Sequence, residues 1–156
     1  MQVLAHAFAK AAMFLAAGLL YESLGHDKIA KFSGAARIMP MTFFALGLGG
    51  LSLMGLPPSG GFAAKWLLMR ASVASGQWVW ALVLIGGGLL AAGYVYRILA
   101  PALANEPVKL KASPRRGGEA IALTLALVAV ALGFAPQSFF QLLDIGRPAL
   151  MTAGLP

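Results

Sequence analysis

Four apolar segments dominate the sequence, and we interpret each as a span that crosses a lipid bilayer as a helix. A membrane-spanning helix needs about 20 mainly apolar residues, and it satisfies the backbone hydrogen bonds that lipid cannot provide. Hydrophobic residues make up 60% of the 156 residues, and charged residues only 11%. A soluble domain of this size cannot usually bury so much apolar surface. We therefore predict an all-α integral membrane protein with about four spans.

The predicted spans differ in length, and the second is nearly twice as long as a bilayer requires. It holds Pro57 and Pro58 near its middle, and we interpret it as one crossing whose helix is broken there. We expect one transmembrane domain over residues 1–156. The predicted spans are about 3–24, 38–75 (broken), 77–103 and 119–134, with an interfacial continuation to Leu143 as an option.

Positive charge is concentrated in two loops between these spans, 25–40 and 104–118. A single broken crossing over 38–75 places both loops on one side, which the positive-inside rule makes cytoplasmic, with both termini outside. A hairpin of two crossings would place the loops on opposite sides. The net charge of +7 therefore reflects topology, and we expect no nucleic-acid partner. The predicted location is a bacterial-type inner (plasma) membrane. The loop charges are Lys28, Lys31, Arg37, Lys109, Lys111, Arg115 and Arg116.

The segment "GLPPSGG" is the point at which the second span is interrupted. Pro57 and Pro58 remove two backbone donors and clash with the preceding turn. Gly55, Gly60 and Gly61 permit an unwound backbone and close helix packing. Unwound backbone at membrane depth is tolerated only where protein or a hydrated cavity covers it, and transporters use such broken helices to build ion sites.

Lys65 follows this break by about two helical turns, well away from either basic loop. A charged lysine at the bilayer centre costs roughly 2.5–3.5 kcal/mol, so it requires a partner or water. Desolvation favours the neutral amine and a nearby carboxylate favours the ammonium, so a lysine balanced between the two can load and release a proton. The alternative is that Lys65 extends to the membrane interface, which the neighbouring Trp66 and Arg70 would suit.

The first span contains a second polar pair in "AHAFAKAAMFL". His6 and Lys10 are four residues apart and share one face of a helix, and together they suit two links of a proton path. They could equally lie in the lipid headgroup region, because both are among the first ten residues of the sequence. No basic region precedes the segment, so we do not expect a signal peptide.

Other kinds of site are not indicated. The sequence has no cysteine, and it shows no nucleotide motif, metal-ligand set or nucleophile–base pair. We therefore predict no catalytic residue, metal or cofactor in this chain. No acidic residue lies inside an apolar span unless Glu22 or Glu119 is drawn in from its end. We accordingly expect any carboxylate partner of Lys65 to come from elsewhere.

Three motifs in this order and spacing resemble a known family: "HAFAKAAMFLAAG", "HDKIAKFSGAARIMP" and "GLPPSGGFAAKWLLM". They are similar to the antiporter-like, proton-conducting membrane subunits of respiratory complex I, multisubunit cation/proton antiporters and membrane-bound hydrogenases. The last motif looks closest to the quinone-proximal complex I member. The resemblance runs from about His6 to Arg97.

The resemblance implies a role for each matching residue. Lys65 matches the lysine on the broken helix of the second inverted repeat, next to the exit half-channel. Lys10 and His6 match polar residues of the preceding helix, and Pro57 and Pro58 match the break. The family fold is a bundle of about fourteen helices with two inverted repeats, of which this chain matches only the end.

The resemblance therefore implies proton or cation translocation within a heteromeric complex, with protons or sodium ions as the coupling ion. Another chain, or the rest of a longer one, is expected to supply the missing first repeat. A membrane subunit of an NADH:quinone oxidoreductase-like complex is the expected context. Two alternatives remain, namely a structural or assembly subunit without its own ion path and a small homo-oligomeric transporter.

Overall fold

The structure is a computed structural model, and it describes residues 1–105 and 108–135. Every regular element in these residues is helical, so the predicted all-α class is confirmed. The elements are α1 (Gln2–Leu24), η1 (Ile29–Lys31), α2 (Ala35–Ile38), α3 (Pro40–Met54), α4 (Gly60–Ala74), α5 (Val79–Ala102), α6 (Arg116–Ala131) and η2 (Leu132–Phe134).

Three helical segments are long and apolar enough to cross a membrane: Gln2–Leu24, Val79–Ala102 and Arg116–Phe134. The apolar α3 is shorter, and length alone does not identify it as a span. That α3 and α4 together make one crossing stays a prediction, as does the total of four spans. The possible interfacial continuation to Leu143 lies outside the described residues.

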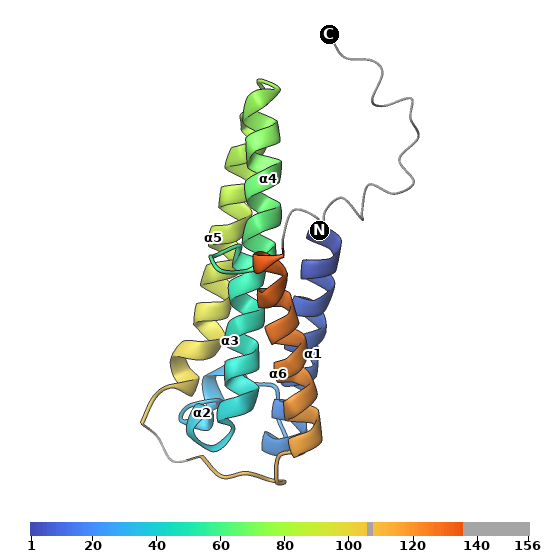
Figure 1. The fold of residues 1–156 in the computed structure, drawn as a ribbon. Helices are drawn as coiled ribbons and strands as arrows, with labels where there is room; N and C mark the ends of the chain where they lie inside the picture. Colours follow the sequence, from blue (N-terminus) through green and yellow to red (C-terminus); the bar gives the residue numbers. More distant parts are fainter. Residues whose placement is uncertain (106–107, 136–156) are drawn as a thin grey trace.

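The interruption after α3 produces two helices that follow each other in broadly the same direction. In Figure 1, α4 continues beyond the end of α3, and α5 returns alongside both. The chain leaves α3 through Gly55, whose φ of +78° is a left-handed value that glycine adopts without strain. The peptide bond between Pro57 and Pro58 is cis.

Helices α1, α3 and α6 form the most closely packed part of the bundle. They meet through small residues, which let helix backbones approach closely in a membrane protein. A Cβ added at Gly49 of α3 would lie 2.9 Å from Met13 Cγ and 3.1 Å from the Ala9 carbonyl oxygen of α1. Fully buried alanines continue these contact faces on α1 and α6: Ala5, Ala9, Ala12, Ala16, Ala122, Ala126 and Ala129.

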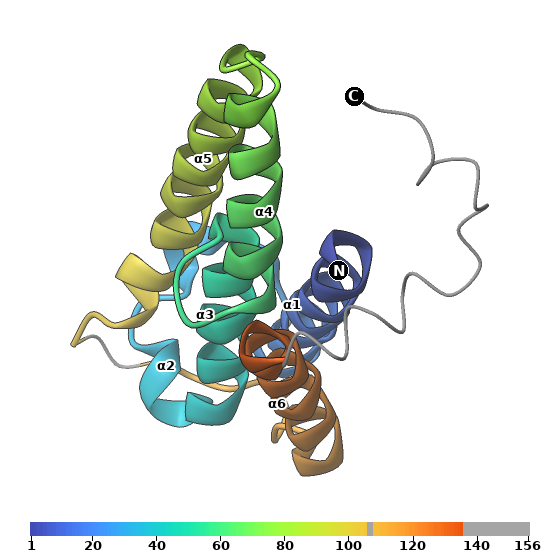
Figure 2. The same cartoon turned by 45° about the horizontal axis from the view of Figure 1, so that its top comes forward.

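Helices α4 and α5 form a hairpin whose tip extends beyond the ends of α1 and α6 (Figure 2). Most large apolar side chains of this hairpin are exposed in the isolated chain. The break between α3 and α4 lies near the N-terminal end of α1 and the C-terminal end of α6 in Figure 1. Ser59 and Gly60, where the break joins α4, are buried, whereas Leu56, Pro57 and Pro58 are exposed in the isolated chain.

The two basic loops lie together at the opposite end of the bundle (Figure 1). The backbone N–H of Lys111 donates to the Ser23 carbonyl oxygen at 2.8 Å, and that of Gly34 donates to the Pro101 carbonyl oxygen at 3.3 Å. These bonds join each loop to a helix end from the other part of the chain. The side of the membrane on which this end lies remains a prediction.

Candidate ion-translocation site at the helix break

Two buried serines fix the backbone of the break. Ser59 is the N-cap of α4: its hydroxyl accepts from the Phe62 backbone N–H at 3.1 Å and donates to the Leu56 carbonyl oxygen at 2.7 Å. The Ser52 hydroxyl accepts from the Gly61 N–H at 3.3 Å. Backbone groups released by the prolines and by the start of α4 thus find partners inside the protein, as a membrane environment requires.

The glycines of the break are needed because other backbone segments approach them closely. A Cβ at Gly61 would lie 1.8 Å from the Ser52 carbonyl oxygen, a distance that excludes any side chain. A Cβ at Gly60 would lie 2.8 Å from Leu132 Cβ and 3.0 Å from Ala5 Cβ. Glycine therefore lets α3, α1 and the end of α6 converge on the start of α4.

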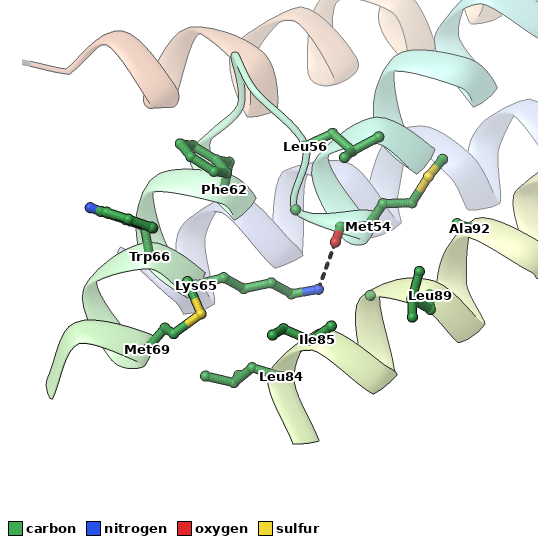
Figure 3. A pocket seen from close by; sticks show the side chains of 12 residues that line it. Met54, Leu56, Phe62, Lys65, Trp66, Met69, Leu84, Ile85, Leu89 and Ala92 are labelled. Atoms are coloured by element: carbon green, nitrogen blue, oxygen red, sulfur yellow. Dashed lines mark hydrogen bonds between the residues drawn. The ribbon is translucent and has the colours of Figure 1, made fainter. Parts of the chain in front are cut away.

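Lys65 turns back toward this break. Its ammonium Nζ donates to the Met54 carbonyl oxygen at 2.9 Å (Figure 3). It also donates to the Leu53 carbonyl oxygen at 3.1 Å. These carbonyls belong to the last turn of α3, where helical carbonyls lack intrahelical partners and the helix dipole is negative. The C-terminal end of α3 thus holds the cation carried by α4.

A cavity of about 240 Å³ surrounds the Lys65 side chain, between the end of α3, α4 and α5. Apart from Lys65, the lining side chains are apolar or aromatic, among them Phe62, Trp66 and Ile85 (Figure 3). The half-buried lysine therefore projects its charge into surroundings that supply few polar contacts. In such surroundings the two backbone carbonyls matter more than they would in water.

Two further glycines define the position of the lysine. A Cβ at Gly55 would lie 2.5 Å from Lys65 Cδ. A Cβ at Gly88 of α5 would lie 2.8 Å from the Met54 carbonyl oxygen and 3.4 Å from Lys65 Nζ. Gly88 is not among the site residues predicted from the sequence. We name these two glycines, with the carbonyls of Leu53 and Met54, the lysine seat.

No carboxylate contacts Lys65 within residues 1–105 and 108–135. The ion pair found in this part of the chain joins Arg115 to Glu22 at 4.0 Å, on exposed side chains. That a carboxylate partner comes from elsewhere stays a prediction. The carbonyl acceptors were not foreseen, because a reading by residue type considers side chains and overlooks backbone groups.

His6 and Lys10 are not brought into contact with Lys65. Both are exposed on α1 in the isolated chain. Lys10 Nζ lies 5.9 Å from the centroid of the Phe14 ring. It lines a second, larger cavity, whose wall includes Leu53, so one carbonyl acceptor of Lys65 belongs to a residue that borders the Lys10 cavity. The roles of His6 and Lys10 remain predictions.

A buried carboxyl group between α3 and α6 was also not predicted. Thr42 Oγ1 donates to Glu119 Oε1 at 2.7 Å, and the two residues are 0% and 6% exposed. The position of Glu119 near the start of an apolar segment was the available signal. Its partner lies 77 residues away in the sequence, so only the tertiary structure reveals the pair.

Comparison with known proteins places these features in a family. The profile described as "NADH:quinone oxidoreductase/Mrp antiporter, TM" matches residues 1–91, which include α1, the break and Lys65. NADH-quinone oxidoreductase subunit N of Desulforudis audaxviator is 36% identical over 120 residues, which is 77% of this chain. NADH-ubiquinone oxidoreductase chain 5 of Geomys personatus is 36% identical over 110 residues, or 69% of this chain.

A solved structure has the same fold. A chain from the Mrp complex of Dietzia sp. DQ12-45-1b aligns with a TM-score of 0.78 and 24% identity, covering 88% of this chain and 34% of that chain. The present chain spans only 23% and 18% of the lengths of the two relatives above. The profile match, which covers more than half of the chain, shows that it belongs to the NADH:quinone oxidoreductase/Mrp antiporter transmembrane family.

Proposed function

We propose that this chain is the C-terminal portion of a proton-translocating, antiporter-like subunit, in which Lys65 switches its protonation state. The observation that carries the proposal is the lysine seat. The Lys65 ammonium on α4 is held by the terminal carbonyls of α3 inside an apolar cavity. Within the described residues, no carboxylate contacts it. Family membership supports ion translocation as the setting.

The energetics of the seat suit a group that must give up its proton. A hydrogen bond from a charged donor contributes roughly 1.5–3 kcal/mol. Moving one charge across 100 mV involves about 2.3 kcal/mol. The free energy available from a membrane potential is therefore of the same order as that of a hydrogen bond to Lys65. Breaking a buried ion pair would instead cost about 3–5 kcal/mol. The carbonyls therefore stabilise the ammonium without trapping it.

A change of charge near Lys65 would shift its preference between ammonium and amine. We propose that redox chemistry or a counter-ion gradient elsewhere in the complex supplies that change through a neighbouring ion pair. Protons are the proposed coupling ion, with sodium ions as the variant. In an NADH:quinone oxidoreductase-like complex, this chain would translocate ions without taking part in the redox reaction.

Lys10 and His6 are proposed as further carriers on α1. Their exposure in the isolated chain leaves both available to helices supplied by the rest of the subunit. Lys10→Ala is expected to slow proton translocation without stopping it, because water in a polar path can partly replace a lost carrier. A rate equal to that of the parent complex would exclude α1 from the path.

The proposal also requires partners, namely the lipid bilayer and other membrane subunits that supply the missing helices. Native mass spectrometry of the complex purified through a tag on this chain tests this requirement. We expect the companion membrane helices to co-purify, in a second chain or in a longer form of this one. Recovery of only identical copies of this chain would favour the homo-oligomeric transporter instead.

A substitution of Lys65 distinguishes an ion-translocating subunit from a structural or assembly subunit. In the complete complex, reconstituted into vesicles, Lys65→Met is expected to abolish proton translocation and leave assembly intact. A structural subunit would tolerate this apolar replacement and could become more stable, since a desolvated charge is removed.

A further inference from the structure

The cavity beside Lys65 combines one cation with apolar walls. Its volume is about 240 Å³, and it lies between the end of α3, α4 and α5. Apart from Lys65, its lining consists of apolar and aromatic residues and two glycines. Figure 3 shows the lysine side chain reaching from α4 toward the end of α3, with residues of α5 beside it. The proposed function uses the charge of Lys65 and leaves the apolar space without a role.

The ammonium of Lys65 has one more hydrogen-bond donor than the lysine seat uses. A lysine ammonium carries three N–H donors and no acceptor. Within residues 1–105 and 108–135, two of these donors are directed to the carbonyl oxygens of Leu53 and Met54. Both acceptors are uncharged, so no anionic group balances the charge of Lys65 in this part of the chain. The site therefore favours a ligand that brings one anionic acceptor.

Several residues of the cavity wall are exposed, so the cavity is open to its surroundings in the isolated chain. Trp66 is 47% exposed and Leu89 is 69% exposed. The rings of Phe62 and Trp66 stack at 6.2 Å between centroids, with an interplanar angle of 20°. The wall also includes Met54 and Met69, whose unbranched side chains adapt to the shape of an apolar group. An apolar tail can thus lie against these walls and extend out of the cavity.

Size and charge together select the class of ligand. Ligand pockets usually measure about 300–1,000 Å³, so this smaller cavity suits a compact headgroup and a narrow tail. Lys65 would repel an organic cation, and a neutral apolar molecule would leave the remaining donor unsatisfied. A phosphate has more charge and more oxygen atoms than one remaining donor can satisfy in apolar surroundings. A carboxylate on an alkyl chain matches both the donor and the walls.

We propose that this cavity binds a monocarboxylate with an alkyl tail, of the fatty-acid class, whose carboxylate accepts a hydrogen bond from Lys65 Nζ. The tail lies between α4 and α5, against Phe62 and Ile85. A carboxylate beside Lys65 favours the ammonium over the neutral amine, so the bound ligand keeps this lysine protonated. The ligand is therefore an inhibitor of translocation. Inhibition rests on the proposed function, whereas binding depends on the cavity alone.

Photo-labelling of the complete complex in vesicles tests the binding. The probe is a diazirine analogue of decanoic acid, and the corresponding analogue of decanol, which has no charge, is the matched control. We expect the acid probe to label the cavity wall on α4 and α5 at least about tenfold more than the alcohol probe, because only the carboxylate gains a charge-assisted hydrogen bond. Mass spectrometry of the labelled peptides identifies the positions.

Two outcomes of this labelling would contradict the proposal. One is equal labelling of the wall by both probes, which would mean that the charge of Lys65 selects no ligand. The other is an unlabelled wall in the complete complex, which would mean that other helices of the complex fill the cavity.

Three variants separate the charge from the space, with assembly checked by native mass spectrometry. Lys65→Met should reduce labelling by the acid probe about tenfold and leave labelling by the alcohol probe unchanged. Ala92→Phe places a ring in the cavity wall and should reduce labelling by both probes. Ala91→Phe makes the same change one residue earlier in α5, outside the cavity lining, and should alter neither. Parent-like labelling of Lys65→Met by the acid probe would exclude Lys65 as the partner of the carboxylate.

Inhibition is measured as the proton-translocation rate with decanoate, divided by the rate of the same complex without it. We expect saturating decanoate to slow the parent and Ala91→Phe complexes at least about tenfold more than the Ala92→Phe complex, because separating a buried ion pair is costly. A general effect of decanoate on the membrane would slow all three complexes equally. Equal slowing with a labelled cavity would leave the binding site in place and overturn the proposed role of Lys65 in translocation. Selective slowing of the parent without label in the cavity would place the inhibitory site elsewhere and refute this one.

Discussion

The hydroxyl of Thr42 on α3 donates a 2.7 Å hydrogen bond to Oε1 of Glu119 on α6, and both residues are buried. This bond joins helices that are far apart in the sequence, at the end of the bundle where the basic loops lie. A buried carboxyl group that loses its donor must bear its desolvation cost alone. The pair should therefore contribute to the stability of the bundle.

Thr42→Val is expected to lower the free energy of unfolding by about 1–3 kcal/mol, because valine preserves the shape of threonine and removes the donor. Denaturant titration of the purified complex measures the change. Thr124→Val is the matched control, since the exposed Thr124 hydroxyl bonds only to the Ala120 carbonyl of its own helix. Equal stability of the two variants would mean that the buried bond contributes nothing.

Ser59→Ala is expected to destabilise the break by about 1 kcal/mol through loss of the N-cap of α4. It would also leave the Leu56 carbonyl without its 2.7 Å partner. Denaturant titration measures the free energy of unfolding, and vesicle assays measure the translocation rate. Both quantities should fall, because the break positions Lys65. Ser75→Ala, at an exposed serine near the end of α4, should change neither. A Ser59→Ala variant with parent-like transport would show that the cap is dispensable.

Gly88→Ala is expected to displace the ammonium of Lys65 from the Met54 carbonyl, because the added Cβ would lie 2.8 Å from that oxygen. Loss of one charge-assisted hydrogen bond should slow translocation by about one to two orders of magnitude. Assembly should be preserved, since alanine favours the helical conformation of α5. The measurement is the initial rate of proton uptake by vesicles containing the reconstituted complex.

Gly87→Ala provides the comparison for this prediction, because nothing lies within 4 Å of a Cβ at Gly87. It makes the same chemical change one residue earlier in α5 and should leave the rate unaltered. If both variants were slowed equally, the flexibility of α5 would be the cause, and the lysine seat would not explain the effect.

Much of the helical architecture could be predicted from the sequence, because apolar length and breaker residues are local signals. The span predicted at about 3–24 is close to α1, and that at 77–103 is close to α5. The break could also be located, since Pro57 and Pro58 cannot continue a helix. The number of crossings could not be determined in this way, and the side of the membrane on which the basic loops lie stays a prediction.

The details of the site could be predicted only in part. Lys65 stood out because a charge in an apolar segment is costly, but its partners are backbone carbonyls that the sequence does not display. Gly88 gave no distinguishing signal beside Gly86 and Gly87, because its role depends on where α5 meets the end of α3.

The role of Lys65 as the proton carrier is tested most directly by comparing two substitutions on the same helix, Lys65→Met and Arg70→Met. Arg70 is exposed on α4 and belongs to neither cavity. Proton translocation is measured in vesicles that contain the complete complex, with assembly checked by native mass spectrometry. We expect the Lys65→Met complex to assemble without translocating protons, and the Arg70→Met complex to do both. Translocation by an assembled Lys65→Met complex at the parent rate would contradict this role of Lys65.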